Sequence, residues 1–275
     1  MLSNEKLNEL KTFSQKVRKK IVQILGLAGS GHPGGSLSSA DIIVALYSGI
    51  MKYDPLKPRM AERDRFVLSK GHACPALYVV LAFKGFFPVE DLDTLRKLGS
   101  HLQGHPDMKS TPGIDMSAGS LGQGLSAACG IALAGKIDDK EYFTYCIIGD
   151  GESQEGQVWE AAMFAAHNKL NNLIVFLDFN KLQIEGKVKD IIGPLNFQDK
   201  WQSFGWHVQV INGHSYEHIF QAVSAAKQEK EKPSIIISNT IKGKGVSFME
   251  GNLSFHGATP TEEEIQKAIE EINGI

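Results

Sequence analysis

Short apolar runs alternate with stretches of helical periodicity, and this alternation restricts the possible folds more than any other sequence feature. The predicted strands are residues 142–148, 172–178 and 234–238. The predicted helices are residues 5–28, 39–50, 154–169 and 215–229. Apolar strands that alternate with helices form sheets whose two faces are both covered. We therefore predict an α/β fold with a mostly parallel sheet and helices on both faces.

Composition excludes several classes of protein. Of 275 residues, 42% are hydrophobic and 22% are charged, which is typical of a globular protein. No repeat or linker divides the chain, so we predict a single domain over residues 1–275. The net charge of -2 argues against a nucleic-acid partner.

The cellular compartment is also constrained by the sequence. No apolar run approaches the roughly 18 residues of a membrane span, and the N-terminus has polar residues where a signal peptide is apolar. Cys74, Cys129 and Cys146 form no CxxC pair, and we interpret them as buried free thiols. We expect a cytoplasmic protein with no membrane contact.

Polar residues follow two successive predicted strands. Gly149-Asp150-Gly151 comes directly after the first, and Asn180 follows the next. Ligands of parallel sheets bind beyond the carboxyl ends of the strands. Carboxylate and amide oxygens suit Mg²⁺, which commonly shares its ligands with phosphates, and the glycines allow a diphosphate to approach closely. A simple turn is the alternative for the Gly-Asp-Gly alone, but the paired placement after two strands favours a metal–diphosphate site.

These segments resemble a known family. Residues 149–162 read GDGESQEGQVWEAA and residues 178–186 read DFNKLQIEG, which closely resembles the thiamine-diphosphate motif of transketolases. Further matches, in order, are SGHPG (30–34), LSKGHA (68–73), GHP (104–106), GSLGQG (119–124) and FHG (255–257). The resemblance spans nearly the whole chain, and its motifs are specific in combination.

The resemblance implies thiamine diphosphate and Mg²⁺ as cofactors, with Ca²⁺ or Mn²⁺ as substitutes for the metal. Its metal ligands from the chain are Asp150, Asn180 and the main-chain carbonyl of Leu182. The residues implied to bind the cofactor are His72, Gly119, Ser120, Leu121, Gly149, Asp150, Gly151, Glu152, Asn180, Lys242 and His256. Ser120 stands where most transketolases carry proline, which is a mild departure.

Histidines mark the expected reaction centre. His32, His72, His105 and His256 each adjoin a glycine or proline, and the resemblance implies that they line the substrate channel and the thiazolium site. Imidazole exchanges protons readily near neutral pH, as the movement of hydroxyl protons requires. A single loop histidine is more often only solvated, but four in glycine-rich loops favour a site. The histidines predicted to lie at the surface are His101, His167, His207, His214 and His218.

Other charged residues allow two interpretations each. Lys70 either neutralises phosphate or is solvated, and Lys242 with Lys244 forms a KGKG stretch without Walker spacing. Glu155 and Glu160 suit a helix N-terminus. The resemblance implies instead an interface role, which we favour for Glu155: glutamates there share a proton network between active sites.

In the family a second domain carries the glutamate that activates the aminopyrimidine, and we expect that domain to be absent from this chain. We therefore expect a transketolase N-terminal subunit that works with a C-terminal subunit bearing the pyrimidine-binding domain, in two copies of each chain. A truncated sequence is the alternative. The expected reaction transfers a two-carbon ketol unit from a ketose phosphate to an aldose phosphate, as in the pentose phosphate pathway. The rival functions are those of a deoxyxylulose-phosphate synthase, a non-catalytic regulatory subunit or a 2-oxoacid dehydrogenase α-subunit.

Overall fold

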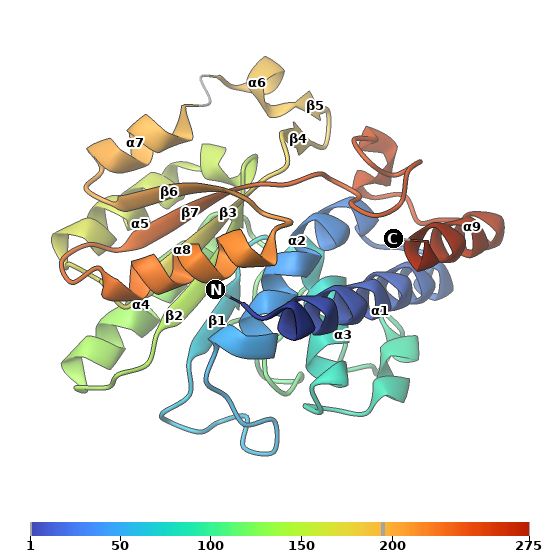
Figure 1. Ribbon diagram of the computed structural model, residues 1–275, viewed down its shortest axis with the longest axis horizontal. Coiled ribbons are helices and arrows are strands. Elements are labelled where there is room, and N and C mark those ends of the chain that lie inside the picture. Colours follow the sequence, from blue (N-terminus) through green and yellow to red (C-terminus); the bar gives the residue numbers. More distant parts are fainter. Residues whose placement is uncertain (1, 194–195, 275) are drawn as a thin grey trace.

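The computed structural model describes residues 2–193 and 196–274, and a five-stranded sheet forms the centre of that part of the chain (Figure 1). The strand order is β1-β2-β3-β7-β6, and every neighbouring pair is parallel. The strands are β1 (Arg65–Leu68), β2 (Thr144–Gly149), β3 (Leu173–Phe179), β6 (His207–Asn212) and β7 (Ser234–Asn239). A short antiparallel pair, β4 (Leu182–Gln183) with β5 (Gly186–Lys187), lies outside the sheet. The predicted parallel sheet is confirmed.

Two strands of the sheet were not predicted from the sequence. β2, β3 and β7 correspond to the three predicted strands, and their side chains are almost all buried. β1 has only four residues, too few to stand out from the charged segment before it. β6 is an edge strand whose side chains are half-buried or exposed, so its sequence has no continuous apolar run.

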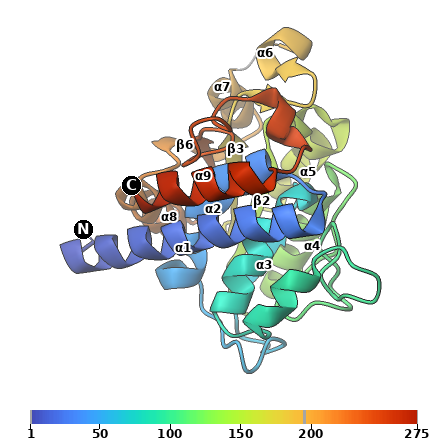
Figure 2. The same cartoon turned by 90° about the vertical axis from the view of Figure 1, so that its right-hand side faces the viewer.

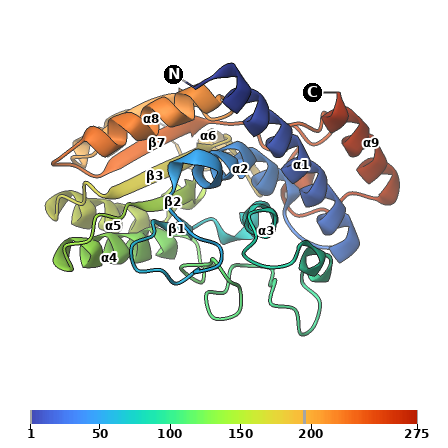
Figure 3. The ribbon, with the colours of Figure 1, turned by 60° about the horizontal axis from the view of Figure 1, so that its bottom comes forward.

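Helices cover both faces of the sheet (Figure 3), as predicted. The larger helices are α1 (Asn4–Ala28), α2 (Pro33–Ala45), α3 (Cys74–Phe83), α4 (Gln123–Ile137), α5 (Gly156–His167), α8 (Tyr216–Gln228) and α9 (Glu262–Asn273). The shorter ones are α6 (Val188–Ile191) and α7 (Phe197–Ser203). Helices α4, α5 and α7 pack on one face, whereas α2 and α8 pack on the other with α1 and α3 behind them. Helix α9 runs beside α1 (Figure 2).

Helix α2 differs most from its prediction. It begins at Pro33 rather than at residue 39, and every residue to Ala45 is buried. A helix buried all round has no polar face, so periodicity cannot show where it begins. Proline at the first position starts it, and a π-helical turn over Leu46–Ile50 continues it to the predicted end. The predicted helices at 5–28, 154–169 and 215–229 correspond to α1, α5 and α8 with small shifts at their ends.

The core lies in two clusters, one on each face of the sheet. Tyr145 and Phe176 face the cluster of α1, α2, α3 and α8, while Cys146 and Val175 face the cluster of α4, α5 and α7. All three cysteines are free and buried, as predicted. Across residues 2–193 and 196–274, each helix is too short or too polar to pass through a lipid bilayer.

Candidate functional site

The ends of β2 and β3 bring the predicted metal ligands to one edge of the sheet. The two strands are parallel, and Gly149 pairs with Asp178 at their carboxyl ends. The chain therefore leaves the sheet at the same level in both places, and Asp150 and Asn180 follow immediately. Parallel pairing accounts for the closeness of two motifs separated by about thirty residues in the sequence.

A cavity of about 410 Å³ opens at this edge. The predicted site residues that line it are His32, His72, His105, Gly119, Leu121, Gly149, Asp150, Gly151, Glu152, Asn180, Leu182, Lys242 and His256. Lining residues that were not among the predicted site residues include Gly35, Gln154, Gln183 and Ile184, the last three within the quoted motifs. Several separate loop segments thus meet in one cavity, which is large enough for a small cofactor.

Two predicted site residues lie outside the lining. Ser120 and Glu155 are both exposed. Glu155 precedes α5 without capping it through its side chain, and its Cβ lies against Gly122. Its interface role and the cofactor contact of Ser120 stay predictions.

Asp150 is a buried carboxylate with unused capacity to bind a cation. It is 2% exposed, and its oxygens accept hydrogen bonds from the main-chain N–H groups of Gly151, at 2.8 Å, and Lys181. Burial, together with the neighbouring Asp178 carboxylate, raises the pKa of Asp150 to about 7. A nearby cation would favour the ionised form, so this environment suits a metal ligand.

Asn180 and Leu182 supply the remaining ligands of the predicted metal site. The Asn180 Oδ1 accepts a hydrogen bond from the main-chain N–H of Leu182 at 3.1 Å. The carbonyl oxygen of Leu182 accepts one from the Lys242 ammonium at 3.3 Å, which shows that a cationic group can reach it.

The donor set fits a magnesium ion. Among the described residues, no three His, Cys, Asp or Glu side chains gather in a metal-holding group. The predicted site does not need such a group, because its ligands are one carboxylate, one amide and one main-chain carbonyl. These are oxygen donors beside room for a diphosphate, as Mg²⁺ requires.

Two lysines line the cavity. Lys70 is 2% exposed and pairs with Asp178 beneath the cavity, so the alternative of a solvated Lys70 is wrong. The Lys242 ammonium lies 2.7 Å from Nδ1 of His256. Burial, followed by the charge of Lys70, lowers the pKa of Lys242 to about 8. Because Lys70 is already paired with Asp178, Lys242 is the ammonium group that favours an anionic ligand such as a diphosphate.

The four predicted histidines form one cluster. The His32 ring centroid lies 5.2 Å from that of His72, 6.5 Å from His105 and 5.5 Å from His256. Burial and nearby positive charges lower the pKa of each, to about 4 for both His32 and His256. Neutral imidazoles at pH 7 can both donate and accept hydrogen bonds. The buried Nδ1 of His32 has no hydrogen-bond partner among the described residues.

Glu152 connects the loops around the cavity. Its carboxylate accepts hydrogen bonds from Ser69 Oγ and from the main-chain N–H groups of Gly122 and Gly149, the last two at 2.9 Å. Burial raises the pKa of Glu152. Glu152 therefore connects three cavity loops and is itself part of the cavity lining.

The remaining histidines divide into two groups. His167 and His218 are exposed, as predicted. The surface prediction was wrong for the other three, which are partly buried. Their partners are Asp91 for His101, Ser234 for His207, and Asp41 with the main-chain N–H of Ile241 for His214. These contacts come from segments that no sequence pattern links.

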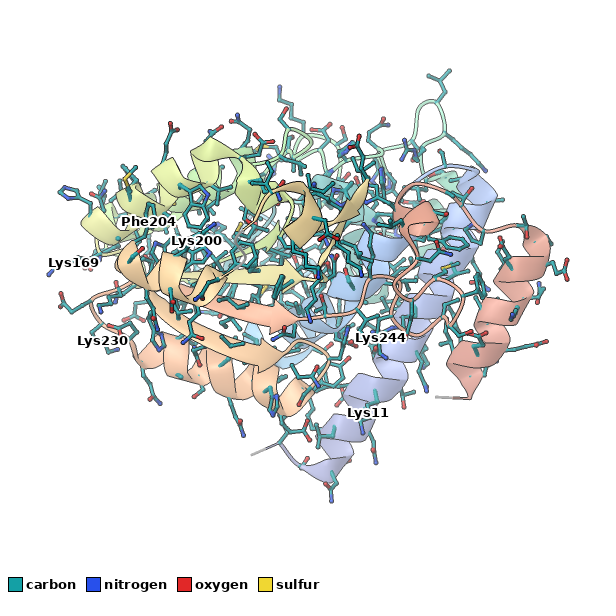
Figure 4. The ribbon with its side chains drawn as sticks, turned by 90° about the horizontal axis from the view of Figure 1, so that it is seen from above. Lys11, Lys169, Lys200, Phe204, Lys230 and Lys244 are labelled. Carbon is teal, nitrogen blue, oxygen red and sulfur yellow. The ribbon has the colours of Figure 1, made fainter. Side chains whose placement is uncertain are left out.

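A second cavity of about 410 Å³ lies beside α1 and the start of α8. Lys11 and Lys244 line it and lie near one another in Figure 4. Its buried charges already have partners: Arg18 pairs with Asp41, which also accepts from Ser14 and Tyr216. This network holds α1, α2 and α8 together, so the cavity near Asp150 is the better candidate site.

Comparison with known proteins decides the family. Residues 11–274 match the family described as the thiamine diphosphate binding domain of transketolase. The chain belongs to the transketolase family. Human transketolase is 42% identical over 274 residues, which are 98% of this chain and 42% of that protein. The domain thus spans less than half the length of such single-chain transketolases.

Two relatives match this transketolase domain nearly end to end. The 6-deoxy-6-sulfo-D-fructose transketolase subunit SqwG of Clostridium sp. (strain MSTE9) is 52% identical, covering 98% of both chains. An apulose-4-phosphate transketolase subunit of Phocaeicola vulgatus is 44% identical, covering 96% of this chain and 94% of the relative. Both are named as subunits.

Solved transketolase structures share the fold. Transketolase from Campylobacter jejuni superposes with a TM-score of 0.90 at 36% identity, covering 99% of this chain and 43% of that one. Transketolase from Leishmania mexicana superposes with a TM-score of 0.91 at 32% identity, covering 96% and 41%.

Proposed function

We propose that this chain is the cofactor-diphosphate subunit of a two-chain transketolase. It transfers a two-carbon ketol unit from a ketose phosphate to an aldose phosphate, and a partner chain supplies the pyrimidine-binding domain. The observation that carries the proposal is the single cavity in which the metal-ligand set, two lysines and four neutral histidines meet. The subunit names and matching lengths of the two relatives support the split arrangement.

In this proposal, the chain's residues bind, orient and exchange protons. Asp150, Asn180 and the Leu182 carbonyl hold Mg²⁺, and Lys242 attracts the diphosphate. Bound thiamine diphosphate supplies the carbanion chemistry that breaks and forms carbon–carbon bonds.

The histidines act on the sugar in this scheme. His32, His105 and His256 exchange hydrogen bonds with its hydroxyl and carbonyl oxygens. Because their pKa values lie below 6.5, they are mostly neutral at pH 7, so each ring can donate a hydrogen bond from one nitrogen and accept a hydrogen bond or a proton at the other.

We propose the donor sugar of this chain only as a chemical class. The two relatives are named for 6-deoxy-6-sulfo-D-fructose and for apulose 4-phosphate, and each of these ketoses carries an anionic group. The proposed donor is therefore a ketose with an anionic group. Five- and six-carbon ketose phosphates of the pentose phosphate pathway are the general alternative. We also propose a cytoplasmic location, with which the free thiols are compatible.

The test is a ketol-transfer assay on the chain mixed with the C-terminal chain of the same source, thiamine diphosphate, Mg²⁺ and an aldose phosphate as acceptor. Donors should include 6-deoxy-6-sulfo-D-fructose, fructose 6-phosphate, xylulose 5-phosphate and apulose 4-phosphate, and Asp150→Ala serves as the inactive control. Transfer from any of them supports the proposal. Cofactor binding without transfer from any donor would favour a non-catalytic regulatory role instead.

A further inference from the structure

Asp178 is a fully buried carboxylate directly behind the proposed metal site. It has no exposed area and pairs in register with Gly149 at the ends of β3 and β2. Its Oδ2 accepts hydrogen bonds from Ser38 Oγ, at 2.6 Å, and from the Lys70 ammonium. Its Oδ1 accepts from Thr240 Oγ1. These donors come from α2, the loop after β1 and the loop after β7, so Asp178 connects three segments beneath the cavity.

One contact of Asp178 reaches a proposed metal ligand. The Asn180 Nδ2 donates to Asp178 Oδ2 at 3.3 Å, while the Asn180 Oδ1 accepts from the Leu182 N–H at 3.1 Å. The oxygen and nitrogen ends of an amide have nearly the same shape, so packing alone cannot choose between them. An ionised carboxylate only accepts hydrogen bonds, and it therefore selects the NH₂ end.

The other partners of Asp178 agree with this contact. The Lys70 ammonium and the hydroxyl groups of Ser38 and Thr240 all donate to its two oxygens. The carboxylate is thus an acceptor on both oxygens. With the NH₂ end of Asn180 held by Asp178, one lone pair of Oδ1 bonds the Leu182 N–H and the other is left for a ligand.

We propose that Asp178 is a positioning residue that fixes the Asn180 amide with its oxygen turned toward the metal. The inference rests on the proposed function, because it assumes that Mg²⁺ binds at Asn180. A competing explanation makes Asp178 only the counter-ion of Lys70, since a buried lysine needs an anionic partner. The two explanations differ in what happens when the polarity of residues 178 and 180 is exchanged.

The test measures Mg²⁺ affinity by calorimetry on the chain with its partner chain at saturating thiamine diphosphate. Asp178→Asn can donate as well as accept, so the Asn180 amide loses its preferred orientation. We expect Mg²⁺ affinity to fall about 10- to 100-fold, as is usual when a residue behind a metal ligand is lost. The exchange Asp178→Asn/Asn180→Asp should recover most of that affinity, because both oxygens of an aspartate at 180 are ligands and need no orientation.

Thr240→Val is the matched control. It removes a hydrogen bond to the same carboxylate without touching Asn180, and it should leave Mg²⁺ affinity nearly unchanged even if it lowers the melting temperature. Wild-type affinity in Asp178→Asn, or a double variant no better than the single one, would overturn the positioning role. Absence of Mg²⁺-dependent binding by the wild-type complex would instead overturn the proposed function.

A second measurement applies if Asp178→Asn does not fold. The side-chain NH₂ signals of Asn180, assigned by comparison with Asn180→Asp, can be followed by NMR in the metal-free wild-type chain. A fixed amide hydrogen-bonded to a buried carboxylate should exchange its protons with water slowly. Exchange as fast as that of an exposed asparagine would exclude the proposed orientation.

Discussion

At the scale of single residues, the site contains titratable side chains that are buried before any ligand binds. The carboxylate of Asp150 and the imidazoles of His32 and His256 all have pKa values displaced toward their neutral forms. Burying these groups costs free energy, and a bound anionic cofactor with its cation would offset part of that cost. The ligand-free site is therefore expected to be a source of instability that ligands relieve.

The first prediction concerns Asp150→Asn in the metal-free chain. The folded pKa of Asp150 is about 7, above its ordinary value of 3.8, so its stabilising contribution is present below pH 3.8 and is lost as pH rises through 7. The variant should therefore be more stable than wild type at pH 8 in EDTA, by on the order of 3 kcal/mol, and the difference should shrink toward pH 4. Melting temperatures across this range would measure it, and a difference that does not vary with pH would contradict it. Mg²⁺ with thiamine diphosphate should stabilise only the wild type.

The second prediction concerns the histidine cluster. His32→Gln and His105→Gln should each lower kcat of the two-chain enzyme by about 100-fold or more, because each removes a group that exchanges protons or hydrogen bonds with the sugar. Melting temperatures should change little. His218→Gln, an exposed position on α8, is the control and should behave as wild type. Wild-type kcat in both cluster variants would contradict a role for these histidines in the reaction.

At the scale of elements, the sequence predicted what apolar runs determine. Buried central strands such as β2, β3 and β7 are continuous apolar segments, so their positions followed directly. The edge strand β6 was not predicted because it has no continuous apolar run, and α2 was predicted only from residue 39 because a helix that is buried all round shows no periodicity.

The same limit applied to the site. Asp150 and Asn180 were found because each follows a strand, whereas the partners of Asp178 are far from it in sequence and meet it only in the folded chain. The partners of Glu152 are similar, since Ser69 is 83 residues away.

The third prediction tests how α4 meets the cavity loops. A Cβ on Gly124 would lie 2.5 Å from Ser69 Oγ and 2.6 Å from Ser69 Cα, so Gly124→Ala must displace main chain. We expect a loss of about 1–3 kcal/mol in the free energy of unfolding, together with weaker cofactor binding. Gly130→Ala on the same helix meets nothing within 4 Å and should instead stabilise by about 0.5–1 kcal/mol. Urea denaturation of both variants measures the change in the free energy of unfolding. Equal changes in the two variants would contradict the close packing of Gly124 against Ser69.

At the scale of the whole molecule, apolar side chains stay exposed around and beyond the cavity. They include Leu121 and Ile184 in the cavity lining and Met163 and Phe164 on α5, of which Met163 is 55% and Ile184 68% exposed. Exposed apolar groups beside a site are typical of protein interfaces. These exposed apolar side chains are therefore expected to be buried against the proposed partner chain. Glu155 lies at the start of α5, the helix that carries Met163 and Phe164.

The fourth prediction follows from that arrangement. The chain alone, at saturating thiamine diphosphate and Mg²⁺, should bind the cofactor weakly and show no ketol transfer, because the group that activates the aminopyrimidine is proposed to lie on the partner. Adding the partner should restore activity and give an assembly with two copies of each chain, measured by light scattering. Turnover by the isolated chain, with its mass verified, would refute the two-chain proposal.

The order of strands in the sheet has a consequence for how the protein is made. β7 lies between β3 and β6, although it is the last strand of the sheet in the chain. A chain growing from its N-terminus therefore presents β3 with one unpaired edge until residues 234–239 have been synthesised. Lys242 and His256 follow later still, so the proposed cofactor site is complete only after the sheet is complete. The cofactor's stabilising effect should appear as slower unfolding of the finished protein.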